Sequence, residues 1–92
     1  MIRLNVFMRL NDLADKEKVV ALAQKLVEAS RKDKGCVAYD VFASETLPRN
    51  LMICETWKSV EDLDAHGATE HFQRIVPQLE ELAPMKAERF DF

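Results

Sequence analysis

The side chains best suited to acid–base chemistry gather in one stretch, residues 51–72, which holds both histidines and the only tryptophan. A histidine exchanges protons near neutral pH, so His66 is the candidate general base. Trp57 is expected at the end of a strand, where an aromatic side chain can stack on a planar ligand. The pattern favours a binding site where a strand end meets a helix end, with Trp57 as the pocket wall.

A structural role stays open for each of these side chains. His66, near the end of a predicted helix, could serve only to stabilise the helix C-terminus through the helix dipole. Trp57 could belong to the core. His71 is expected in the first turn of the next helix, beside Phe72, where a capping or solvated role is favoured over direct participation in chemistry.

Three more polar residues lie on predicted strands. Glu55 sits in an apolar strand, so it must be paired, and a structural ion pair is favoured. Its candidate partners on neighbouring strands are Arg3, Arg9 and Arg89. Asn5 and Tyr39 lie in the middle of their strands and need partners if they are buried. They could line a pocket between sheet and helices, with Asn5 donating to a ligand carbonyl.

Several common site types have no matching motif. The chain has two glycines, too few for a dinucleotide fingerprint or a P-loop. His66 and His71, with Glu55 or Glu70 as a third ligand, have no recognised metal spacing. We therefore expect no metal and no cofactor. Cys36 and Cys54 lack CxxC spacing and are predicted to be buried free thiols.

Length and charge restrict the class of protein. Ninety-two residues predict a single domain, residues 1–92. The formal net charge of −3 argues against nucleic-acid binding, which needs a basic face. The sequence has no polybasic tract and no apolar run of membrane-spanning length, and its first ten residues alternate in polarity instead of forming a signal-peptide core. We expect a cytoplasmic protein that binds neither nucleic acid nor membrane.

Hydrophobic periodicity predicts the order strand, helix, strand, strand, two helices, strand. The expected strands are residues 1–10, 36–45, 51–57 and 85–92. A first helix, capped by Asn11-Asp12 or Asp15, is expected to run up to a left-handed stop at Gly35. Ser59 and Thr69 are expected to cap the two later helices, and Pro77 should kink or loosen the last one.

This order is typical of an α+β fold, the ferredoxin-like split βαβ with a four-stranded antiparallel sheet. Helices can cover one face of that sheet only, yet several strands carry apolar side chains on both faces. The apolar residues that the helices cannot all cover are Phe7, Phe42, Met52, Cys54 and Phe90. An uncovered apolar face predicts a homodimer in which two sheets pack face to face.

Four short motifs resemble the antibiotic biosynthesis monooxygenase domain, in particular its small bacterial quinol monooxygenase-like members. They are Glu55-x-Trp57-x-Ser59, Leu63-x-Ala65-His66, Thr69-x-His71-Phe72 and Gly35-Cys36-x-x-Tyr39. The resemblance covers nearly the whole chain. It implies a ferredoxin-like fold that dimerises into an α+β barrel.

The resemblance also implies an activity: oxidation of a small aromatic phenol or quinol by molecular oxygen, without flavin, haem or metal. The substrate loses a proton and its own anion reduces oxygen. His66 matches the recurring histidine of the family and is the expected catalytic base. The expected substrate-binding residues are Asn5, Tyr39, Trp57, His71 and Phe72.

Other functions remain open on the same fold. Some relatives degrade haem with an Asn on the first strand, a Trp and a His, for which Asn5, Trp57 and His66 are the counterparts. Others isomerise phosphorylated breakdown products of signalling sugars. A non-catalytic dimeric module that binds ligands or acts in stress is a further alternative.

Overall fold

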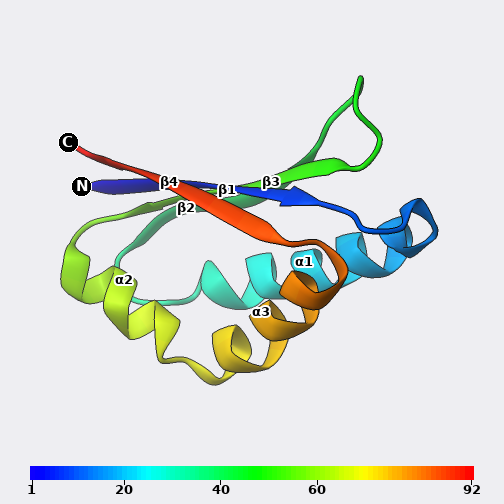
Figure 1. Cartoon of the computed structure of the whole chain (residues 1–92). Helices are drawn as coiled ribbons and strands as arrows, with labels where there is room; N and C mark the ends of the chain where they lie inside the picture. Colours follow the sequence, from blue (N-terminus) through cyan, green and yellow to red (C-terminus); the bar gives the residue numbers. More distant parts are fainter.

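Four strands form one antiparallel sheet, and all the helices pack against the same face of it (Figure 1). The computed structural model describes residues 1–92. Its strands, in the spatial order β2-β3-β1-β4, are β1 (Ile2–Arg9), β2 (Cys36–Ala43), β3 (Asn50–Trp57) and β4 (Met85–Asp91). Its helices are η1 (Leu13–Asp15), α1 (Lys16–Ser30), α2 (Val60–Gly67) and α3 (Glu70–Leu82). This order confirms the predicted ferredoxin-like fold.

The hydrophobic core lies between the sheet and the helices. Successive side chains of a strand point to opposite faces, so every second residue of β1 and β3 faces the helices. These strand residues meet the apolar sides of α1 and α3 in one buried cluster. Its members are Met8, Leu10, Val19, Ala23, Leu26, Val27, Tyr39, Leu51, Ile53, Trp57, Ile75, Leu79 and Ala83.

Two predicted caps fix the positions of the histidines. Ser59 accepts a hydrogen bond from the third residue of α2 at 3.1 Å, and Thr69 accepts one from the third residue of α3 at 3.3 Å. Each cap satisfies a backbone N–H that the helix itself leaves without a partner. His66 therefore falls in the last turn of α2 and His71 in the first turn of α3.

The end of the first helix differs from the prediction. α1 ends at Ser30, so Gly35 does not terminate it. Gly35 has φ +80° directly before β2 and is the one residue of the chain with a positive φ. Its conformation closes the loop that follows α1. At the start of the helix, Asp12 caps η1 through the Ala14 N–H at 2.9 Å, and Asp15 makes no side-chain cap.

The second strand is shorter and more irregular than expected. It ends at Ala43, and its pairing with β3 shifts between Cys36 and Ala38. The extra residue, Val37, is 50% exposed instead of sharing the helix-facing side with Tyr39. A bulge puts two residues opposite one, so strict alternation fails there. The last helix, α3, runs through Pro77 without a break and ends at Leu82.

The other face of the sheet carries apolar side chains that no element covers. Phe7, Phe42 and Phe90 are 45%, 52% and 49% exposed. The strand register places Phe42 opposite Met52 and Met52 opposite Phe7, so these three form a row across β2, β3 and β1. The sequence-based expectation of an uncovered apolar face is confirmed.

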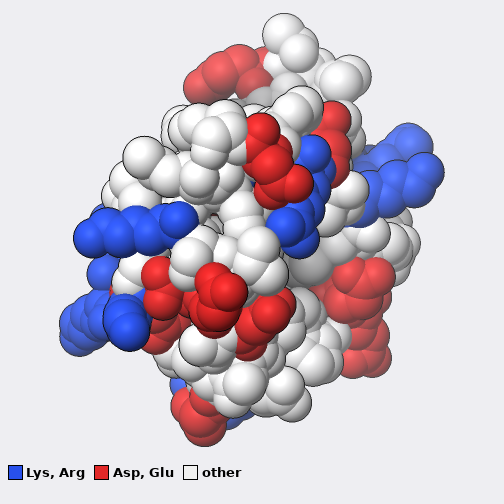
Figure 2. Space-filling view, turned by 90° about the vertical axis from the view of Figure 1, so that its left-hand side faces the viewer, with Lys and Arg blue, Asp and Glu red and all other residues white.

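Charged side chains of both signs share the surface. The view in Figure 2 shows Lys and Arg next to Asp and Glu, with no continuous basic area on that face. A search of the helices for one with the length and hydropathy of a membrane span finds none.

Replacing Gly35 by alanine is expected to destabilise the protein by about 1–3 kcal/mol. The new Cβ would collide with the carboxyl group of Asp62, and the positive φ of residue 35 strains any L side chain. Urea unfolding followed by circular dichroism measures the loss. Gly67→Ala is the matched control, because a Cβ at Gly67 meets no heavy atom within 4 Å. Equal stability of the two variants would contradict this role of Gly35.

Candidate functional site

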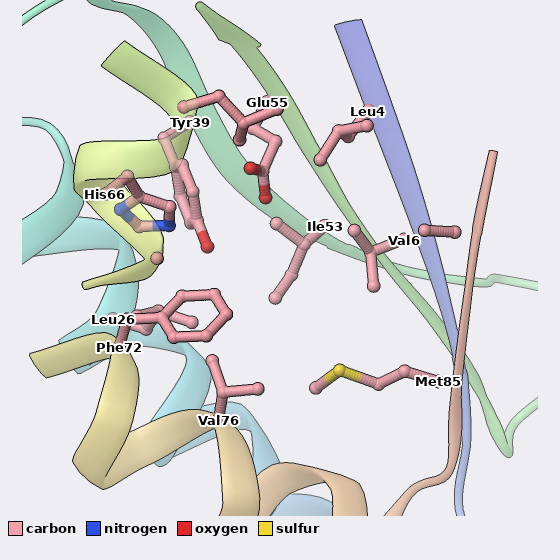
Figure 3. A pocket seen from close by; sticks show the side chains of 13 residues that line it. Leu4, Val6, Leu26, Tyr39, Ile53, Glu55, His66, Phe72, Val76 and Met85 are labelled. Carbon is pink, nitrogen blue, oxygen red and sulfur yellow. The ribbon is translucent and has the colours of Figure 1, made fainter. Parts of the chain in front are cut away.

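A cavity of about 380 Å³ lies between the sheet and the helices, and every strand and the three α-helices contribute to its wall (Figure 3). Ten of the thirteen lining residues are hydrophobic, so a bound molecule would meet mostly apolar surface. The lining residues are Leu4, Val6, Leu26, Tyr39, Ile53, Glu55, Leu63, His66, Gly67, Phe72, Val76, Met85 and Ala87.

Three polar side chains meet at one end of this cavity. The register pairs Tyr39 with Glu55 on adjacent strands, so both point to the helix-facing side of the sheet. His66 reaches the same end from α2. Figure 3 shows Tyr39, Glu55 and His66 together, with the side chains of Val76 and Met85 at the opposite end. The cavity therefore has a polar end and an apolar end.

Glu55 makes no ion pair, which corrects the sequence-based expectation. Its side chain is 5% exposed, and Oε1 accepts a hydrogen bond of 2.9 Å from the indole N–H of Trp57. Burial raises the pKa of Glu55, against the lowering effects of the Trp57 hydrogen bond and of His66. The site therefore disfavours the charged carboxylate relative to a carboxylate in water.

Tyr39 is 3% exposed and is held in its neutral form. Burial raises the pKa of its phenol, and the neighbouring Glu55 carboxyl raises it further. Its hydroxyl is thus a hydrogen-bond donor at the polar end of the cavity.

His66 is enclosed by aromatic rings. It is 1% exposed, and its ring centroid lies 4.6 Å from that of Trp57, 5.2 Å from Phe72 and 5.4 Å from Tyr39. Its Nε2 atom is buried without a hydrogen-bond partner, although His66 lines the cavity. An unpaired buried polar atom is costly and calls for an explanation, which a ligand would provide.

The other ring nitrogen of His66 is tied to a residue that the sequence did not single out. His66 Nδ1 lies 2.8 Å from Asp33 Oδ2, and His71 Nε2 lies 2.8 Å from the same oxygen. Asp33 sits in the loop between α1 and β2. It is the one acid in the basic run of residues 31–34, and this is the only signal that could have drawn attention to it.

The expected substrate-binding residues are only partly brought together. Tyr39 and Phe72 line the cavity. Trp57 is fully buried against the ring of His66 and is not among the residues that line the cavity, which differs from the expected Trp57 wall. His71 also lies behind His66, in contact with Asp33 instead of the cavity.

Asn5 is on the wrong face of the sheet for the expected role. Its neighbours Leu4 and Val6 line the cavity, so alternation turns Asn5 to the uncovered face. There it accepts a hydrogen bond from Arg3 at 3.2 Å and donates one to Glu88 at 3.1 Å. The Asn–Trp–His set of the haem-degrading relatives is therefore not assembled around this cavity.

One group of side chains has the atom types of a metal site. Ligand atoms of Asp33, His66 and His71 lie within 4.8 Å of one another. The two nitrogen–oxygen separations of 2.8 Å are hydrogen-bond lengths, so hydrogen bonding alone accounts for this geometry.

The fold and the cavity define a ferredoxin-like α+β protein with a mostly apolar cavity that contains a histidine. The family profile described as antibiotic biosynthesis monooxygenase matches residues 1–78. The chain belongs to this family, which confirms the resemblance in the sequence motifs.

Individual relatives agree with the assignment. A solved structure from Bacteroides thetaiotaomicron, a conserved protein of unknown function described as a possible oxidoreductase, is 48% identical with a TM-score of 0.94, over 99% of this chain and 96% of that chain. YcnE of Bacillus subtilis, named as a candidate monooxygenase, is 33% identical over 80% of each chain. The uncharacterized protein sll1783 of Synechocystis is 33% identical over 79% of this chain but 50% of its own length, so the chain spans about half of that relative.

The raised pKa of Glu55 predicts how stability depends on pH. The folded protein binds a proton at Glu55 more tightly than the unfolded chain does, so this contribution is present below the ordinary value of 4.5 and is lost as pH rises through the folded value. We expect the unfolding free energy of the wild type to fall relative to that of Glu55→Gln as pH increases from 4.5. Urea titrations of both proteins across this range measure the difference. A difference that stays constant with pH would contradict the prediction.

Proposed function

We propose that the chain is a cofactor-independent monooxygenase that oxidises a small aromatic quinol or phenol with molecular oxygen. The observation that carries the proposal is the buried, unpartnered Nε2 atom of His66 at the polar end of an apolar cavity. Membership of the antibiotic biosynthesis monooxygenase family and the name of YcnE support an oxygenase activity.

The cavity suits a small aromatic molecule. A volume of about 380 Å³ is at the lower end of the range for small-molecule sites. Leu4, Ile53, Phe72 and Val76 would cover the ring, while its oxygen atoms would meet the polar end. A ligand that fills an apolar cavity displaces water from it, which strengthens the electrostatic interactions of a bound anion.

The first chemical step is a proton transfer to His66. A hydroxyl group of the substrate gives its proton to Nε2, which acts as general base. The anion left behind is electron-rich. The Tyr39 hydroxyl donates a hydrogen bond at the same end of the cavity and stabilises its negative charge.

The remaining steps involve only the substrate, oxygen and His66. A ring carbon of the anion gives electrons to oxygen, which forms a carbon–oxygen bond and a peroxide anion, and the imidazolium returns its proton to the outer oxygen. The ring carbon that carries the hydroperoxide then loses its hydrogen as a proton, and the oxygen–oxygen bond breaks. The hydroxide that leaves combines with this proton to form water. One oxygen atom stays in the product as a carbonyl, so the substrate itself supplies every electron.

His66→Gln should lose about 10²–10⁴-fold of the oxygen uptake above the buffer rate, because glutamine fills the space without acting as a base. The measurement uses EDTA-treated protein and reduced naphthoquinols in an oxygen electrode. Lys25→Ala, an exposed position on α1, is the control and should keep the wild-type rate.

Two results would count against this function. Equal oxygen uptake by wild type, His66→Gln and buffer would remove the catalytic proposal. If calorimetry then showed that the naphthoquinol binds without oxygen consumption, the chain would be a non-catalytic ligand-binding module, the alternative from the sequence.

The same proposal includes a homodimer formed through the uncovered sheet face. The row of Phe42, Met52 and Phe7 is apolar, and exposed aromatic side chains in a row favour association with a second copy of the surface. Two copies packed face to face would form the α+β barrel that the family resemblance implies.

Phe42→Glu should convert the dimer into a monomer, because it places a charge in the apolar row of the proposed interface. Light scattering at micromolar concentration measures the mass. Val60→Glu is the control: Val60 is 42% exposed but begins α2, away from the sheet, and a glutamate is favourable in a first helical turn. A monomeric wild type would rule out the interface.

A further inference from the structure

The hydrogen bonds behind His66 determine which of its nitrogens carries the proton. A carboxylate oxygen only accepts hydrogen bonds, so each imidazole nitrogen at 2.8 Å from Asp33 Oδ2 must carry hydrogen. In neutral His66 the proton is then on Nδ1. Nε2 is left with a lone pair and faces the cavity as an acceptor.

His71 holds the carboxylate in place for this purpose. Asp33 lies in a loop and its side chain is 16% exposed, so a single hydrogen bond would leave it room to rotate. The second donor comes from α3, and Thr69 fixes the start of that helix. Asp33 therefore accepts hydrogen bonds from two helices. The bond from His71 on α3 fixes the carboxylate, and the carboxylate in turn fixes the ring of His66 on α2. Other polar groups that face His66 are Tyr39, whose neutral phenol is a donor, and Glu55, whose pKa is raised by burial.

We infer that Asp33 and His71 are positioning residues that make His66 Nε2 the acceptor of the cavity, and that the site therefore selects aromatic ligands with a hydroxyl group at that point. The inference rests on the proposed function for the class of ligand. The polar end then presents an acceptor, His66 Nε2, and a donor, the Tyr39 hydroxyl. A ligand that fits has a hydroxyl for the acceptor and an oxygen that can accept from the donor.

This arrangement predicts a preference that size and hydrophobicity alone would not give. A methyl ether has nearly the shape of the phenol but has no hydrogen to donate, so it leaves Nε2 buried and unpaired. A site built to bind a hydroxyl rejects the analogue that lacks it, because the buried polar group loses its partner. The cavity should therefore distinguish 1-naphthol from 1-methoxynaphthalene.

The test measures tautomer and binding in the absence of oxygen, so its outcome does not depend on turnover. With two histidines in the chain, ¹⁵N NMR at about pH 8, where free histidine is neutral, reports the protonated nitrogen of each ring. EDTA is present throughout. Calorimetry under nitrogen then gives the affinity for the two naphthalenes.

In the wild type we expect His66 protonated on Nδ1 and 1-naphthol bound about tenfold more tightly than its methyl ether. Asp33→Ala removes the acceptor of the Nδ1 hydrogen, so the Nε2-protonated tautomer should appear and the preference for the hydroxyl should disappear, while the methyl ether still binds. His71→Gln keeps an N–H at the position of Nε2 and should behave as wild type, whereas His71→Leu should lose part of the preference.

Three outcomes would overturn the inference. They are a wild-type His66 protonated on Nε2, equal affinities for the two naphthalenes, or identical behaviour of His71→Gln and His71→Leu. The His71 pair keeps the test decisive if Asp33→Ala fails to fold. Selective binding without oxygen uptake would support the inference and contradict the proposed function, so the two can fail separately.

Discussion

The hydrogen bond between His66 and Asp33 is the interaction on which the site depends. A histidine that is 1% exposed keeps its place only if at least one ring nitrogen has a strong partner, and the carboxylate provides it at 2.8 Å. The Trp57 indole supports the same ring from behind, with the ring centroids 4.6 Å apart. Without the carboxylate both nitrogens would be buried and unpaired. Because Asp33 holds Nδ1 of His66, the ring can keep its Nε2 atom in an apolar cavity without a partner.

The alternation of the strands separates the side chains of the sheet into a face that lines the cavity and an uncovered face. On β1, Leu4 and Val6 contribute to the cavity. The next residues along the strand, Asn5 and Phe7, face the uncovered side of the sheet. The same division places Glu55 inside and Cys54 outside on β3. A substitution on the helix-facing side can therefore alter the cavity without touching the proposed dimer surface. A substitution on the uncovered side can likewise alter that surface without touching the cavity.

The element order and the class of the fold were predictable because they depend on periodicity, caps and turns, which are local properties of the sequence. Ser59 and Thr69 were correctly expected to begin helices, and His66 and His71 followed from them. The bulge at Val37 was not predictable, since it depends on how β2 pairs with β3. The contacts of Asp33 were missed for a similar reason. His66 follows Asp33 by 33 positions in the sequence and His71 follows it by 38, so no local pattern connects them.

The cavity shows why residue type predicts chemistry less well than position does. Asn5 and Trp57 have the right types for ligand binding, yet one faces away and the other is covered. Glu55 was expected to need an arginine, but an indole N–H satisfies one oxygen, and burial raises the pKa of the carboxyl and so lessens the need for a charged partner. The apolar walls, which a sequence cannot distinguish from ordinary core, thus change the properties of the polar groups that they surround. The chemistry available to the site follows from these walls as much as from its polar residues.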